Sequence, residues 1–110
     1  MRESGLGVVD LASGQGRAAA LGDTVMVHFV GRLDDGRQFD STYERGVPFT
    51  LTLGDAGVLD GFNEGLLGMQ IGGKRRLIVP PSLAYGDEGA PPDIPPGAML
   101  EFDVELVAIE

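Results

Sequence analysis

Few side chains in this chain could take part in covalent chemistry. The chain has one histidine, His28, and no cysteine, which excludes disulfides, thiol nucleophiles and thiolate metal sites. His28 lies inside an alternating apolar segment, so we interpret it as structural, although imidazole is the side chain best suited to proton transfer near neutral pH. The dispersed glycines of residues 61–73 follow no strand and fit neither a P-loop nor a dinucleotide fingerprint. We therefore expect no metal and no cofactor.

Carboxylates occur in pairs, which is the pattern of a general acid and base. Asp34-Asp35 and Asp87-Glu88 are two such pairs, and paired carboxylates are the catalytic groups of many glycoside hydrolases. Both pairs lie beside glycine in turn-like segments, where acidic side chains are commonly solvated. A hydrolase is therefore an alternative that the sequence disfavours. It predicts an activity that survives the loss of Tyr85 and Phe62.

Aromatic side chains at the ends of apolar segments form a more informative pattern. Each of them alone is typical of a hydrophobic core. Together with two apolar residues that precede a helical segment, they predict an apolar cleft between a helix and a sheet, the usual form of a binding site in a domain of this size. The residues that predict this cleft are Phe39, Phe49, Val58, Leu59, Phe62 and Tyr85.

The elements that must position these side chains are mainly strands. Apolar and polar residues alternate most clearly over residues 100–106, which is typical of a strand with one buried face. Residues 60–69 have apolar residues at helical spacing, with Asp60 as the expected N-cap. The sequence thus predicts an α+β fold in which an antiparallel sheet covers one short helix. Strands are expected over residues 6–12, 23–30, 37–39, 48–53, 74–79 and 100–106.

Length and charge limit the organisation and the partners of the chain. The 110 residues suit one core, so we expect a single domain over residues 1–110, with a weakly structured strand and loop over 1–20. No apolar run approaches the roughly 18 residues of a membrane span. A net charge of −9 opposes nucleic acid and anionic lipid as partners. We interpret the one basic run, residues 74–76, as solvated or ion-paired.

The absence of cysteine suits the reducing cytoplasm, which is the location we expect. The N-terminal residues lack a basic region followed by a long apolar one, so a signal peptide is not expected. A periplasmic location is the alternative if the chain is part of a longer exported protein.

Four blocks of the sequence, taken in order, are similar to one known family. They are VHFVGRLDDGRQFDS (27–41), GFNEGLLGMQIGGKRRLIVPP (61–81), AYG (84–86) and IPPGAMLEFDVEL (94–106). These blocks resemble the FKBP-type peptidyl-prolyl cis-trans isomerases, which are the receptors for the macrolides tacrolimus and rapamycin. The resemblance covers the chain from about residue 5 to its end. It implies a minimal, single-domain, bacterial-style member, in which a five- to six-stranded antiparallel half-barrel wraps around one short helix.

The resemblance also implies a set of site residues. Phe62 would form the floor of the pocket, and the Tyr85 hydroxyl and the Leu59 N–H would bind substrate carbonyls. Asp40 would face the pocket, with Arg45 close enough to keep it ionised. The catalytic residues implied are Asp40, Tyr85 and Phe102, and the substrate-binding residues are Phe29, Phe39, Phe49, Val58, Leu59, Phe62 and Ile94.

Three departures from the family pattern bear on ligand preference. Phe29 stands where many members have tyrosine, which removes a phenol that would donate to Asp40. Phe62 replaces the usual tryptophan and leaves a smaller floor, which should weaken the packing of a macrolide or a proline ring. The loop positions Gly57, Ala90 and Asp93 are smaller or more polar than in the best-known eukaryotic members. These changes concern substrate preference and drug affinity more than activity.

The function implied by the resemblance is that of a peptidyl-prolyl cis-trans isomerase. Its partners would be X–Pro peptides and unfolded protein clients, with tacrolimus or rapamycin as candidate ligands, and we expect a monomer. The alternative is a catalytically weak peptide-binding or chaperone module on the same fold. The proline-rich segment AYGDEGAPPDIPP (84–96), by itself either a functional or a disordered loop, then becomes an ordered rim that presents Tyr85 and Ile94 to the pocket.

Overall fold

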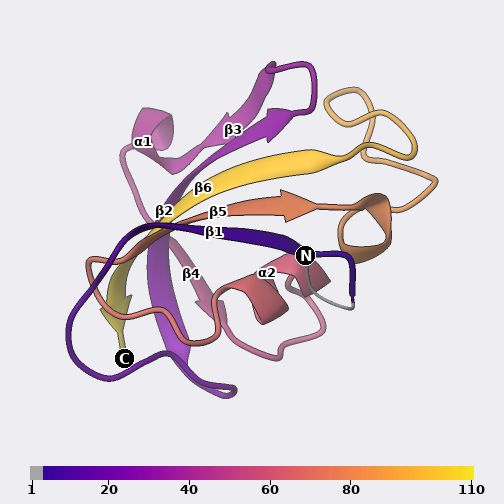
Figure 1. The fold of residues 1–110 in the computed structure, drawn as a ribbon. Helices are drawn as coiled ribbons and strands as arrows, with labels where there is room; N and C mark the ends of the chain where they lie inside the picture. The colour runs from indigo at the N-terminus through magenta and orange to yellow at the C-terminus, as the bar shows by residue number, and fades with distance from the viewer. Residues whose placement is uncertain (1–3) are drawn as a thin grey trace.

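The computed structural model describes residues 4–110, and residues 1–3 of the predicted N-terminal segment lie outside the described residues. Six strands form one antiparallel sheet in the order β1-β5-β6-β2-β3, and β4 pairs with the N-terminal part of β2 (Figure 1). The expected α+β fold, with an antiparallel sheet around a short helix, is confirmed. The strands are β1 Gly7–Ala12, β2 Thr24–Leu33, β3 Gln38–Ser41, β4 Phe49–Thr52, β5 Lys74–Val79 and β6 Leu100–Ile109.

The two long strands, β2 and β6, form the centre of the sheet and bury every second residue. Their pairing runs from Val25↔Ile109 to Leu33↔Leu100, with one irregularity after Met26. This alternation, which runs along all of β2 and up to Leu106 in β6, places one face of each strand in the core and the other toward solvent. Residues that these strands bury in the core are Val25, Val27, Phe29, Leu33, Leu100, Phe102, Val104 and Leu106.

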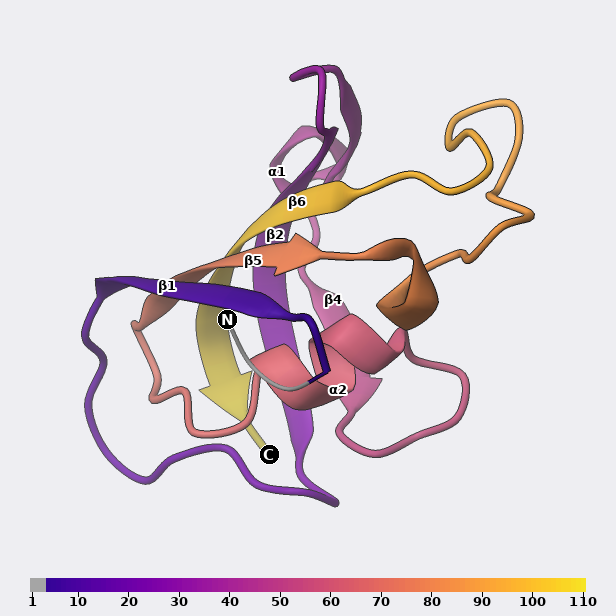
Figure 2. The same ribbon diagram turned by 45° about the vertical axis from the view of Figure 1, so that its right-hand side comes forward.

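The predicted helix is present but shorter than expected. The helix α2 covers Asp60–Gly65 and lies against one face of the sheet (Figures 1 and 2). The prediction that Asp60 is the N-cap was wrong: Leu59 occupies that position, and no side chain caps the N-terminus of the helix. The expected extension to residue 69 was also wrong, because the backbone at Gly68 has a φ of +85°, a left-handed conformation that ends helical geometry.

Two very short elements were not expected from the sequence. The helix α1 covers Thr42–Arg45, and a 3-10 turn, η1, covers Pro81–Leu83. Elements of three or four residues are too short to show a hydrophobic period, so sequence patterns cannot reveal them. No helix within residues 4–110 is long and apolar enough to cross a membrane.

Two glycines let α2 pack unusually close to β5. A Cβ atom built on Gly61 would lie 2.6 Å from Cγ1 of Val79, and one built on Gly65 would lie 2.7 Å from Cδ1 of Leu77. Real Cβ atoms do not approach other carbon atoms this closely, so any larger residue would push the helix away from the strand. Because Gly61 and Gly65 are four residues apart, they share one face of the helix.

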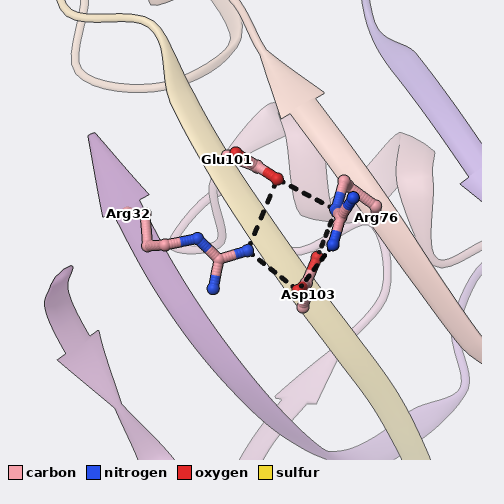
Figure 3. Close-up of polar contacts among 4 residues, drawn as sticks. All are labelled: Arg32, Arg76, Glu101 and Asp103. Carbon is pink, nitrogen blue, oxygen red and sulfur yellow. Dashed lines mark hydrogen bonds and ion pairs between the residues drawn. The ribbon is translucent and has the colours of Figure 1, made fainter. Parts of the chain in front are cut away.

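The outer face of the sheet carries a cluster of four charged side chains, Arg32, Arg76, Glu101 and Asp103 (Figure 3). Asp103 on β6 accepts hydrogen bonds from Arg76 at 2.8 Å and from Arg32 at 2.8 Å, and so links β5 and β2 across the central strand. Glu101 lies 2.9 Å from Arg76 and 3.4 Å from Arg32. The interpretation of the basic run as ion-paired is therefore confirmed for Arg76.

Replacing Asp103 tests this cluster. The hydrogen bonds from Arg76 and Arg32 hold the pKa of Asp103 below its ordinary value, although partial burial opposes them. A lowered pKa means that the carboxylate stabilises the fold above the unfolded-state pKa of about 3.9 and that this contribution is lost as the pH falls through the folded-state pKa. We expect D103N to lower the free energy of unfolding by on the order of 1 kcal/mol at pH 7. Urea denaturation should show this difference shrinking below pH ~4; an equal difference at pH 7 and pH 3 would contradict the ion-pair explanation.

Candidate active site

A cavity of about 260 Å³ opens between α2, the inner face of the sheet and the surrounding loops. All five phenylalanines of the chain line it, although they come from five different elements. The predicted site residues thus converge on one cavity, with the exception of Ile94. The lining residues are Phe29, Phe39, Asp40, Arg45, Phe49, Gly57, Val58, Leu59, Phe62, Tyr85 and Phe102.

The floor of the cavity is a cluster of edge-on aromatic rings around Phe102. Its ring centroid lies 4.7 Å from that of Phe62, 5.7 Å from that of Phe39 and 5.8 Å from that of Phe29, with interplanar angles between 68° and 85°. Edge-on packing is the favoured geometry for aromatic pairs and fixes the rings relative to one another. Phe62 and Phe102 are 3% and 2% exposed, whereas Phe49 is 38% exposed. Phe49 therefore belongs to the rim, and the others form a preformed apolar floor.

Gly31 makes room for this cluster and was not singled out by the sequence. A Cβ atom at Gly31 would lie 2.7 Å from Cζ of Phe39 and 3.0 Å from Cε1 of Phe102. Gly31 is on β2 at the inward-facing register, two residues after Phe29. The signal in the sequence is a glycine at a buried position of an otherwise bulky alternating strand, which marks a close approach of another group.

The charged wall of the cavity consists of Asp40 and Arg45. Asp40 lies on β3 opposite Gly31, and its Oδ1 accepts hydrogen bonds from the Ser41 N–H at 2.9 Å and from Nη1 of Arg45. Arg45 is the last residue of α1, and its guanidinium lies over the Phe29 ring, 5.9 Å from the centroid. The Asp40 carboxylate is therefore paired with the Arg45 guanidinium, and the two residues lie close together as expected.

Thr42 attaches α1 to the sheet and was also missed. Strand β2 pairs with β4 up to Val27 and with β3 from Val30, which leaves Phe29 without a strand neighbour on that side. The fully buried Thr42 hydroxyl accepts from the Phe29 N–H at 2.8 Å and lies 3.3 Å from the Phe29 carbonyl oxygen. It also bonds Nδ1 of His28 at 2.9 Å. One side chain thus replaces the missing ladder bonds behind the cavity floor.

His28 faces the opposite side of β2 from Phe29 and is absent from the cavity lining. Its ring stacks on that of Tyr43, with centroids 4.7 Å apart, and the Tyr43 hydroxyl bonds Glu105 at 3.1 Å. These contacts hold α1 on the sheet and agree with the interpretation of His28 as structural.

The loop before α2 carries Val58 and Leu59 to the rim. Asn63 holds this loop, because its Oδ1 accepts from the Gly54 N–H at 2.8 Å and its Nδ2 donates to the Asp55 carbonyl at 3.0 Å. Among residues 4–110, the Leu59 N–H has no hydrogen-bond acceptor. This donor at the N-terminal end of α2 is therefore available to a carbonyl group in the cavity.

The proline-rich loop supplies Tyr85 to the rim but not Ile94. Tyr85 is 39% exposed, and its hydroxyl has no hydrogen-bond partner within the described part of the chain. Burial, and after it the negative charge of Asp40, raises the pKa of the Tyr85 phenol. Ile94 differs from the expectation: its side chain is buried in the core, its backbone pairs with that of Ala90, and it does not line the cavity.

Comparisons with known proteins place this fold and cavity in a family. The family model for the FKBP-type peptidyl-prolyl cis-trans isomerases matches residues 15–107. The chain belongs to the FKBP family. The resemblance inferred from the four sequence blocks is thereby confirmed.

Relatives of this FKBP domain come from plants, animals and bacteria. FKBP15-2 of Arabidopsis thaliana is 52% identical over 88 residues, which are 80% of this chain and 54% of that protein. FKBP2 of Homo sapiens is 49% identical over 89 residues, 81% of this chain and 63% of that protein. An FK506-binding protein of Neisseria meningitidis serogroup B is 45% identical over 105 residues, 96% of each chain. The FKBP domain thus spans just over half the length of the first of these relatives.

Two solved structures share its fold. The crystal structure of AtFKBP13 superposes with a TM-score of 0.90 at 40% identity, covering 98% of this chain and 95% of that one. FkpA from Escherichia coli superposes with a TM-score of 0.91 at 43% identity, covering 99% of this chain and 50% of that one.

The raised pKa of Tyr85 can be measured directly in this FKBP domain. The chain has two tyrosines, so Y43F leaves Tyr85 as the only phenol. We expect its phenolate absorbance to appear with a midpoint above the ordinary value of 10.0, and D40N in the same background to lower that midpoint by removing a negative charge. A raised pKa means that the neutral phenol stabilises the fold below pH ~10 and that this contribution is lost as the pH rises through the folded-state pKa. A midpoint at or below 10, in protein shown by circular dichroism to be folded, would contradict this environment for Tyr85.

Proposed function

We propose that this domain accelerates rotation about X–Pro peptide bonds in peptides and unfolded proteins. The observation that carries the proposal is the preformed aromatic cavity, whose floor is formed by Phe29, Phe62 and Phe102. Its size and apolar floor fit the ring of one proline side chain, and its rim offers two hydrogen-bond donors. Membership of the FKBP family supports the same reaction.

An apolar cavity suits this reaction because no covalent bond is made or broken. The barrier of roughly 18–20 kcal/mol comes from amide resonance, which is lost when the bond twists. The planar amide is more polar than the twisted one, since resonance puts charge on oxygen and nitrogen. An apolar environment therefore favours the twisted transition state relative to the ground state. Each 1.36 kcal/mol of this preference is worth tenfold in rate.

The polar groups at the rim would orient the substrate backbone. The Tyr85 hydroxyl, which like any phenol is protonated at neutral pH, and the Leu59 N–H both donate, so both suit carbonyl oxygens next to the proline. Asp40 is fixed by Arg45 and the Ser41 N–H. Its carboxylate either contacts the rotating carbonyl carbon or shapes the wall of the cavity, and its engagement with two donors favours the second role.

The same cavity is the proposed site for macrolide ligands. Several relatives are named FK506-binding proteins, and tacrolimus (FK506) and rapamycin are the ligands that we propose for this chain. Because Phe62 is smaller than tryptophan, we expect F62W to bind these macrolides more tightly than the wild type. The cytoplasmic location and the monomeric state stay predictions from the sequence.

Tyrosine-to-phenylalanine variants test the proposed mechanism. Y85F removes the rim hydroxyl, and Y43F makes the same chemical change on the far side of β2, where the hydroxyl bonds Glu105. One hydrogen bond to substrate is worth about 0.5–1.5 kcal/mol, so we expect Y85F to lower kcat/KM for an X–Pro peptide by about 2- to 13-fold. Y43F should leave kcat/KM within about twofold of the wild type. A protease-coupled isomerisation assay measures both.

Two outcomes would count against this proposal. Equal effects of Y85F and Y43F on kcat/KM would mean that the Tyr85 hydroxyl does not contact the substrate. A wild-type protein that binds the X–Pro peptide without accelerating its isomerisation would leave the alternative, a peptide-binding module on the same fold.

A further inference from the structure

The helix α2, which places Phe62 and Leu59 at the cavity, has few stabilising interactions of its own. With six residues, α2 is far shorter than the roughly 12–15 residues at which isolated helices become marginally stable. No side chain caps its N-terminus, and its own last turn contains no basic residue. The carbonyl groups at its C-terminal end therefore need partners from elsewhere in the fold.

Arg75 of β5 supplies those partners. Its Nη1 donates to the Gly65 carbonyl at 3.0 Å and to the Leu67 carbonyl at 2.7 Å, and its Nε donates to Asp10 of β1 at 2.8 Å. The side chain is only 15% exposed, so solvent screens these bonds less than at the surface. A cation at the C-terminal end of a helix also interacts favourably with the helix dipole. One guanidinium thus connects the end of α2, the strand β5 and the edge strand β1.

The position of Arg75 on β5 explains why it can do this. Residues 75, 77 and 79 of β5 point to the same face of the sheet, because side chains alternate along a strand. Leu77 and Val79 are the side chains over which Gly65 and Gly61 pack. Those contacts are apolar and set the distance between helix and strand. The bonds from Arg75 are directional and fix where the helix ends along the strand.

We propose that Arg75 is a positioning residue for the cavity: by holding the C-terminal end of α2, it sets the placement of Phe62 in the floor and of the Leu59 N–H at the rim. Arg75 does not line the cavity, so this role differs from substrate contact. The proposal rests on the proposed isomerase function only for its effect on catalysis. The structural part of the proposal, that Arg75 places α2, does not depend on isomerase activity.

The next residue on β5 provides a matched control. Arg76 points to the outer face of the sheet, opposite to the face on which α2 packs, and bonds Asp103 (Figure 3). R75M and R76M remove the same group from neighbouring positions, and each breaks ion pairs. Only R75M removes the donor from the carbonyl groups of Gly65, the last residue of α2, and Leu67, just after it. A third variant, D10N, removes the ion pair with Arg75 but leaves both carbonyl bonds in place.

We expect R75M to lower kcat/KM for an X–Pro peptide by at least fivefold, at a temperature where urea titrations show each variant to be more than 95% folded. R76M and D10N should stay within twofold of the wild type. The amide resonances of Leu59 and Phe62 should shift in R75M and stay in place in R76M. Hydrogen exchange at the Leu66 amide, which bonds the Phe62 carbonyl, should speed up at least tenfold in R75M alone.

The outcomes separate this proposal from the proposed function. If the wild type has no isomerase activity, the function fails, and the resonance shifts and hydrogen exchange still decide the role of Arg75. Unshifted Leu59 and Phe62 amides in R75M would overturn the positioning role. Equal losses of kcat/KM in R75M and R76M, or an equal loss in D10N, would overturn it as well, because these variants leave the α2 carbonyl bonds intact.

Discussion

The close contact between α2 and β5 is the constraint on which the rest of this structure depends. The helix backbone at Gly61 and Gly65 lies so close to β5 that a side chain at either position would collide with Val79 or Leu77. This contact sets the depth at which Phe62 meets Phe102, and therefore the height of the cavity floor. It also turns the N-terminal end of the helix, with its free Leu59 N–H, toward the opening. The cavity is the space that remains between a helix held at fixed distance and a curved sheet.

A site of this kind suits a reaction that needs an apolar environment but no reactive side chain. Its floor consists of aromatic rings held edge-on, and its one carboxylate is paired with Arg45. Rotation about an X–Pro bond requires neither a nucleophile nor a proton transfer, because the barrier is one of lost resonance. The rim donors would hold the peptide backbone while the proline ring rests on the floor. The acidic turns of the chain, which first raised a hydrolase alternative, lie outside the cavity lining.

The sequence predicted those features that repeat along the chain or rest on local chemistry. Alternation predicted the strands, and aromatic residues at strand ends predicted the cavity before its walls were known. Features that depend on a distant partner were missed: Thr42 fills a gap in the ladder of a strand 13 residues away, and Gly31 makes room for two rings from other strands. Asp60 was expected to cap α2 because of its residue type, but the helix begins one position earlier. Ile94 was assigned to the site by resemblance alone, and the turn formed with Ala90 places it in the core.

Two-dimensional exchange NMR on an X–Pro peptide at equilibrium tests the central claim most directly, since it observes rotation of the bond without any coupled enzyme. Uncatalysed interconversion takes tens to hundreds of seconds at 25 °C, too slow to give exchange peaks at mixing times below about one second. With a small fraction of this protein present, we predict cis–trans exchange peaks at those mixing times, together with a shift of the Leu59 amide on titration with the peptide. A shifted Leu59 amide without exchange peaks would contradict catalysis at this cavity.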